Sequence, residues 1–89
     1  MKKIATPQEF SQLRSAGHGL IYNDFSGMGQ SGKDYNIVHA ADCTQLGKAN
    51  LNVDKYYFDD LDDAVSWLEA HRGQQDVQWK VCGSCGANT

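Results

Sequence analysis

The 89-residue chain lacks the features that mark membrane, secreted and polyanion-coating proteins. No apolar stretch approaches the ~20 residues that a transmembrane helix requires. The residues after Met1 are too polar to form the apolar core of a signal peptide. Eleven acidic residues against eight basic ones give a formal net charge of −3, which does not favour a general nucleic-acid-binding surface. A soluble cytoplasmic protein with no membrane contact is therefore expected.

Cysteine is scarce and odd in number, since the chain has only three. A secreted disulfide framework would leave one of these thiols over, whereas thiols in a reducing compartment usually bind metal or carry out redox chemistry. The chain is also short, and domains of this size often depend on a metal or a disulfide for stability. No repeat or linker divides it, so residues 1–89 are expected to form a single zinc-binding domain.

The cysteines and one histidine form two separated motifs. His39 and Cys43 are spaced as His-x-x-x-Cys in mid-chain, and Cys82 and Cys85 form a Cys-x-x-Cys motif further on. Zn²⁺ prefers four nitrogen or sulfur donors in a tetrahedron, and three cysteines with one histidine are a common structural set. We therefore predict that these four residues bind one Zn²⁺.

Other interpretations of the two motifs stay open at this stage. His18, His71 or Asp42 could replace His39 as the fourth ligand, or the cysteines could bear no metal. A thioredoxin-like redox pair is less favoured, because such a pair usually begins a helix. Here the Cys-x-x-Cys motif follows a strand-like segment instead.

Capping residues predict two helices. Thr6 is a suitable N-cap, Pro7 suits the first helical position and Gly17 suits the end of the same helix. Asp60 is the N-cap of a second helix, which Gly73 should end.

Segments rich in β-branched and aromatic residues predict strands at 19–25, 35–39, 55–58 and 77–81. The second strand would end at His39, and the last would lead directly into Cys82. If these two strands are neighbours, all four predicted ligands meet at one edge of the sheet. The expected fold is α+β, with a small antiparallel sheet and two helices stabilised by one Zn²⁺ site.

The glycine-rich segment 27–33 matches the phosphate-loop pattern by its letters, ending in Gly32-Lys33. Asp34, however, stands in place of the Ser or Thr that would bind Mg²⁺. The residues that follow resemble a strand, whereas phosphate capture needs a helix N-terminus. A hairpin tip is the preferred interpretation.

The pattern His-x-x-x-Cys, aromatic strand, capped helix and Cys-x-x-Cys runs through residues 36–86. In this pattern the chain resembles the Ada-type metal-binding domain, the N-terminal zinc module of the bacterial methyl-phosphotriester repair protein. The resemblance implies a zinc site, an α+β fold and association with nucleic acid in DNA repair, restriction or a phage context. His39 stands where the repair domain has its methyl-accepting cysteine, so methyl transfer is not implied. Gly83 and Ser84 occupy the final turn, where the family has basic residues.

Three functional hypotheses follow. The first is a non-enzymatic zinc-stabilised module that binds nucleic acid through an exposed aromatic ring and four lysines, Lys33, Lys48, Lys55 and Lys80. The second is a zinc-stabilised protein–protein interaction module, which the acidic balance favours. The third is an enzyme with an open zinc or a reactive thiolate, which requires that His39 is not a ligand. The sequence specifies neither the ligand nor the oligomeric state.

Overall fold

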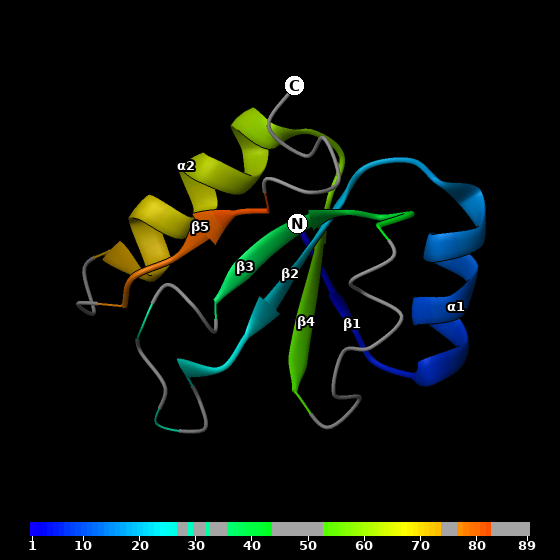
Figure 1. The fold of residues 1–89 in the computed structure, drawn as a ribbon, viewed down its shortest axis with the longest axis horizontal. Helices are drawn as coiled ribbons and strands as arrows, with labels where there is room; N and C mark the ends of the chain where they lie inside the picture. The colour runs from blue at the N-terminus through cyan, green and yellow to red at the C-terminus, as the bar shows by residue number, and fades with distance from the viewer. Residues whose placement is uncertain (27–28, 30–31, 33–35, 44–52, 74–76, 83–89) are drawn as a thin grey trace.

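The chain is an α+β domain built on one five-stranded sheet (Figure 1). In the computed structural model the described residues are 1–26, 29, 32, 36–43, 53–73 and 77–82. Their elements are β1 (Lys2–Ile4), α1 (Pro7–Ala16), β2 (Leu20–Asp24), β3 (Ile37–Ala40), β4 (Asp54–Phe58), α2 (Leu61–His71) and β5 (Lys80–Val81). The predicted fold class is confirmed. Neither described helix is long and apolar enough to cross a membrane.

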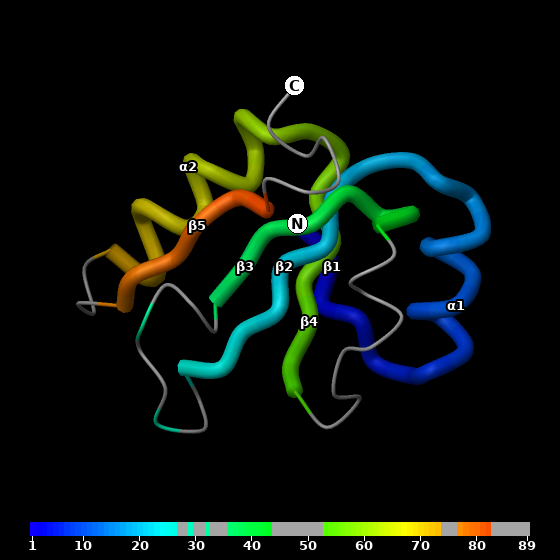
Figure 2. Tube along the Cα trace, viewed as in Figure 1, coloured from blue at the N-terminus to red at the C-terminus, as the bar shows by residue number. Residues whose placement is uncertain are grey.

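The strand order is β1-β4-β2-β3-β5, and all neighbours are antiparallel except one pair. β3 and β5 are parallel, and they run side by side in Figure 2. The sheet is therefore mixed, where the sequence led us to expect an antiparallel one. Parallel strands need a long crossover connection, and the chain provides it by passing through β4 and α2 between β3 and β5.

The two helices cover opposite faces of the sheet (Figure 1). Alternate residues of β2 point to each face. Tyr22 packs under α2 with Phe58 and Leu68, whereas Ile21 packs on the α1 side with Phe10. Because it is covered on both faces, β2 is buried along its whole length.

Both helices begin at the predicted caps. The Thr6 hydroxyl accepts a hydrogen bond from the Glu9 N–H at 3.1 Å, and the Glu9 carboxylate accepts one from the Ala5 N–H at 2.9 Å. Gly17 ends α1 with φ of 66°, a left-handed conformation that suits glycine. The Asp60 carboxylate accepts from the Asp63 N–H at 2.8 Å and so caps α2.

Two strands, β1 and β5, differ most from the prediction. β1 was not predicted, because Lys2-Lys3-Ile4 has neither alternation nor β-branched enrichment; it forms by pairing with the open edge of β4. The strand predicted at 77–81 is regular only over Lys80–Val81. Most of the predicted hairpin tip at 27–33 lies outside the described residues.

Candidate metal centre

His39 and Cys82 lie at the same ends of neighbouring parallel strands. The register pairs Val38 of β3 with Val81 of β5. The Cys82 N–H donates to the Val38 carbonyl at 2.8 Å, which extends the pairing just past the end of β5. The expectation that these two strands are neighbours is confirmed. Strand pairing therefore brings together two residues that are far apart in sequence.

Cys43 reaches the same place through a turn at the end of β3. The Ala41 N–H donates to the Gly19 carbonyl at 3.0 Å, and the Cys43 N–H donates to the Ala40 carbonyl at 2.9 Å. The first bond extends the pairing of β2 with β3 by one residue, and the second closes a turn after β3. Cys43 and Cys82 then belong to the same packed cluster on the α1 side of the sheet.

The potential ligand atoms of His39, Cys43 and Cys82 all lie within 4.8 Å of one another. All three residues are buried, with exposed fractions of 6%, 3% and 7%. His39 pairs with Ile21 in the neighbouring strand, so its side chain projects to the α1 side, where the two thiols lie. One imidazole and two thiols at this spacing form a potential metal-binding cluster.

The state of the imidazole suits metal binding. The Nδ1 atom of His39 is buried and has no hydrogen-bond partner among the described residues. A buried polar atom left in this way costs roughly 1–3 kcal/mol. Burial also lowers the pKa of His39, which favours the neutral ring, and the neutral ring is the form that binds metals. A bound cation would give the His39 Nδ1 atom the partner that the described residues do not supply.

The fourth predicted ligand, Cys85, lies outside the described residues. None of the alternatives considered from sequence joins the cluster. His18 and Asp42 are exposed, and the His71 ring stacks on Trp67 with centroids 4.9 Å apart, beside the opposite face of the sheet. Within the described residues, the donor set is therefore one histidine and two cysteines.

Arg14 is a further residue of this region, and it is not among the predicted site residues. Its Nη2 atom donates to the Cys43 carbonyl at 3.4 Å, and its Nε is buried with no hydrogen-bond partner in the described part of the chain. Arg14 follows Phe10 by four positions, which places it on the helix face that meets the sheet. That spacing was the available signal. The guanidinium places a positive charge near thiols that would be anionic when they bind metal.

The four lysines predicted to contact phosphates are placed differently from one another. Lys33 and Lys48 lie outside the described residues. Lys80 is exposed on β5, two residues before Cys82. Lys55 is only 4% exposed, and its ammonium group donates to the Val53 carbonyl at 3.2 Å. A phosphate could not reach this group without rearrangement of the protein.

No aromatic side chain among the described residues is exposed. The half-buried Trp67 ring contacts Tyr56 and Phe58 at centroid distances of 4.9 and 5.6 Å. The Arg72 guanidinium lies 4.8 Å from the centroid of the Trp67 ring. These rings serve the core and its margin, so the described part of the chain offers no open stacking platform for a base.

No protein-family model, curated protein or solved structure matches the chain. The fold and the cluster therefore define a class only, namely a small α+β domain with a potential His/Cys/Cys metal site.

Proposed function

We propose that this chain is a small non-enzymatic binding module whose fold is held together by one Zn²⁺ bound to His39, Cys43, Cys82 and Cys85. One observation carries the proposal: three buried ligand atoms from two distant segments lie within 4.8 Å of one another. Zinc is the preferred ion because thiolate and imidazole ligands in a tetrahedral set suit it better than Mg²⁺ or Ca²⁺, which prefer oxygen.

Spacing in the sequence supports Cys85 as the fourth ligand. Cys82 already lies in the cluster, and the second cysteine of a Cys-x-x-Cys motif commonly completes such a site. Four protein ligands leave no position for a reactive water, so the proposed site is structural. An enzyme would need the fourth position open.

Native mass spectrometry of the purified protein tests this arrangement. The expected result is one Zn²⁺ per chain in the wild type. Cys85→Ser should weaken metal binding strongly, whereas Ser11→Ala, a change at an exposed position of α1, should leave it unchanged. A wild-type chain that carries no metal after exposure to Zn²⁺ would refute the proposal. A Cys85→Ser chain that binds Zn²⁺ as tightly as the wild type would remove Cys85 from the ligand set.

A protein is the favoured partner class. The net charge is −3, Lys55 is buried, and the described residues expose no aromatic ring. Each of these observations weakens the case for phosphate contacts and base stacking. A protein that binds the zinc-loaded chain, and does not bind the chain after chelation, would support an interaction module. Its binding should change little with salt.

A nucleic-acid ligand is the second candidate, and the exposed position of Lys80 beside the metal cluster favours it. The resemblance to the Ada-type domain points the same way. Phosphate contacts release counterions, so DNA affinity should fall steeply as salt rises, and Lys80→Ala should reduce the salt slope by about 1. An affinity for single-stranded and duplex DNA that does not depend on salt would remove this candidate.

A further inference from the structure

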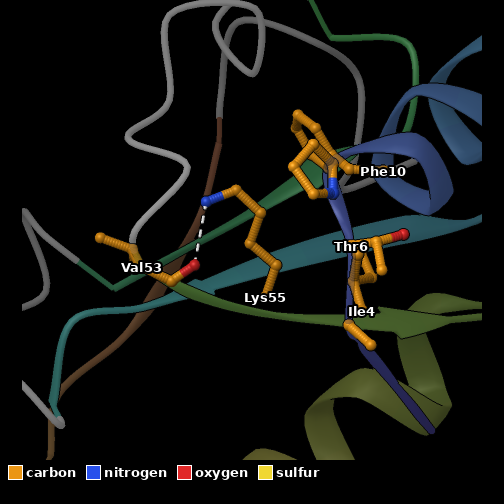
Figure 3. A pocket seen from close by; sticks show the side chains of 7 residues that line it. Ile4, Thr6, Phe10, Val53 and Lys55 are labelled. Carbon is orange, nitrogen blue, oxygen red and sulfur yellow. Dashed lines mark hydrogen bonds between the residues drawn. The ribbon is translucent and has the colours of Figure 1, made fainter.

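Cavities of different size adjoin the two ends of α1. The smaller one lies beside Lys55 and Phe10 at the start of the helix and has a volume of about 60 Å³ (Figure 3). A water molecule takes up about 30 Å³ of liquid volume, so this cavity admits only a few heavy atoms. An open cleft toward the other end of α1 has a volume of about 340 Å³ and is lined by Ser11, Arg14, Ser15 and Asp42. Sites for small molecules have volumes of about 300–1,000 Å³, so the larger cleft is the candidate.

This cleft contains one cationic and one anionic side chain that are not paired. The Arg14 guanidinium and the Asp42 carboxylate both line it, but within the described part of the chain no ion pair joins them to each other or to another residue. The hydrogen bond from Arg14 to the Cys43 carbonyl is long, at 3.4 Å. Two opposite charges that share a cleft without meeting leave space for a ligand that contacts both.

The Asp42 carboxylate lies beside the C-terminal end of α1. A Cβ atom built on Gly17, the residue that caps this end, would be 3.9 Å from the Asp42 Oδ2 atom. The carbonyl end of a helix carries a partial negative charge, and the carboxylate adds to it. A cationic group is therefore favoured at Asp42, and an anionic group is favoured at Arg14.

Uncharged hydrogen-bonding side chains continue from the cleft along α1. Gln8, Ser11, Gln12 and Ser15 are all exposed, and their spacing of i, i+3, i+4 and i+7 places them on one face of the helix. Ser11 also lines a second open cleft, together with Pro7, Gln8 and Gln12. The amides and hydroxyls of this uncharged face both donate and accept hydrogen bonds, so a polar uncharged group suits it.

We propose that the cleft binds a zwitterionic α-amino acid with a polar side chain. Its carboxylate contacts Arg14, its ammonium group contacts Asp42, and its side chain extends along the uncharged face of α1. A phosphate ion would be repelled by Asp42, and a simple cation would be repelled by Arg14, whereas a zwitterion matches both charges. The site uses none of the proposed zinc ligands and goes beyond the function proposed above.

Titration of the purified wild-type chain with L-glutamine, followed by amide NMR, tests the proposal. The signals of the four residues that line the cleft should shift saturably, whereas the signals of α2 should not. N-acetyl-L-glutamine lacks the ammonium group, and the primary amide of L-glutamine lacks the carboxylate. Each analogue should bind about tenfold more weakly, because it loses one charge-assisted contact. The absence of saturable shifts at millimolar glutamine, or an analogue that binds as tightly as glutamine, would overturn the proposal.

A variant at Asp42 locates the ammonium group, and it is preferred to one at Arg14, which also contacts the Cys43 carbonyl. Asp42→Asn should weaken glutamine binding about tenfold but should not weaken the binding of N-acetyl-L-glutamine. Asp62→Asn, the same change at an exposed position of α2, should alter neither. Glutamine binding that is unchanged in Asp42→Asn would overturn the proposal.

L-leucine tests the part of the site along the helix. It has both charges of an amino acid but no amide, so it should bind more weakly than L-glutamine. Leucine that binds as tightly as glutamine would overturn the role given to the uncharged face of α1.

Discussion

The two faces of the sheet are built from different kinds of contact. Under α2 the core is apolar and aromatic, with Phe58, Ala64 and Leu68 fully or almost fully buried. Under α1 the buried residues include a histidine, two cysteines and Lys55. The α2 face is stabilised mainly by hydrophobic burial, and the ion pair between Asp24 and Arg72 lies at its margin. The α1 face carries polar groups whose burial is costly without partners, so we expect it to depend on a ligand.

Of the changes considered, removal of the proposed Zn²⁺ should destabilise the chain most. Structural Zn²⁺ supplies about 10–16 kcal/mol of apparent binding free energy. The net free energy of unfolding of a typical domain is about 5–15 kcal/mol, so the contribution of the metal is at least as large. Chelation should therefore unfold the chain or collapse the dispersion of its amide NMR signals, with α1-face residues affected first. An unchanged spectrum after chelation would contradict the proposed dependence.

Phe58→Ala probes the opposite face. Because Phe58 is 1% exposed and central to the apolar cluster, its truncation should cost about 3–5 kcal/mol of unfolding free energy, measured by urea denaturation with Zn²⁺ present. The folded fraction should still bind one Zn²⁺ per chain. A loss below about 1 kcal/mol would show that this face is not packed as described.

The ion pair between Asp24 and Arg72 joins the end of β2 to the end of α2. The Nη2 and Oδ2 atoms are 2.7 Å apart, and breaking a buried pair costs about 3–5 kcal/mol. Burial raises the pKa of Asp24, but hydrogen bonds from Arg72 and Ser26 outweigh it and leave the pKa below its usual value.

The sign of the pH effect follows from that shift. The unfolded chain takes up the proton on Asp24 first as pH falls, so this contribution to stability is complete above the ordinary carboxyl pKa. It is lost as pH drops through the lower folded-state pKa. Asp24→Asn should lower stability at neutral pH and flatten the acid limb of the stability curve. Asp62→Asn, at an exposed position of α2, is the matched control. If stability falls equally with decreasing pH in both variants, the ion pair between Asp24 and Arg72 does not contribute to acid unfolding.

Removal of the two N-caps should have the smallest effect on stability, and the two variants compare the α1 and α2 faces directly. Thr6→Ala and Asp60→Ala each remove one capping bond, and each should cost about 1 kcal/mol. If the α1 face depends on metal, Thr6→Ala should also weaken Zn²⁺ binding slightly, while Asp60→Ala should not. Zinc titrations in competition with a chelator measure this difference. If the two variants bind Zn²⁺ with the same affinity, the N-cap of α1 does not contribute to metal binding.

Local chemistry made much of the fold predictable from the sequence. Thr6, Gly17 and Asp60 determine where the helices begin and end through bonds to residues three or four positions away. The partners of a strand are not local in this sense. Nothing in the sequence near Ile37 specifies a parallel pairing with Lys80. Nothing in Lys2–Ile4 predicts a strand, because this segment becomes one only by pairing with the edge of β4.

The sequence also predicted part of the candidate metal site. Cysteine and histidine spacing identified the three clustered residues because few other roles use thiols at such intervals. Lys55 was interpreted as a surface residue because lysine usually is one, and only its place in β4 shows otherwise. The spacing of Arg14 from Phe10 indicates only that the two residues share a helix face, and it does not indicate that the guanidinium reaches the Cys43 carbonyl.

The parallel pairing of β5 with β3 has a consequence for the order of assembly. His39 and Cys43 are synthesised well before Cys82, and the hydrogen bonds that the described residues make to the Cys43 backbone come from Ala40 and Arg14, which also precede β5. If the proposed Zn²⁺ site is correct, two of its ligands are therefore translated before β5. Metal capture would then be the event that recruits the last strand, so the availability of the ion during translation would govern how much protein matures.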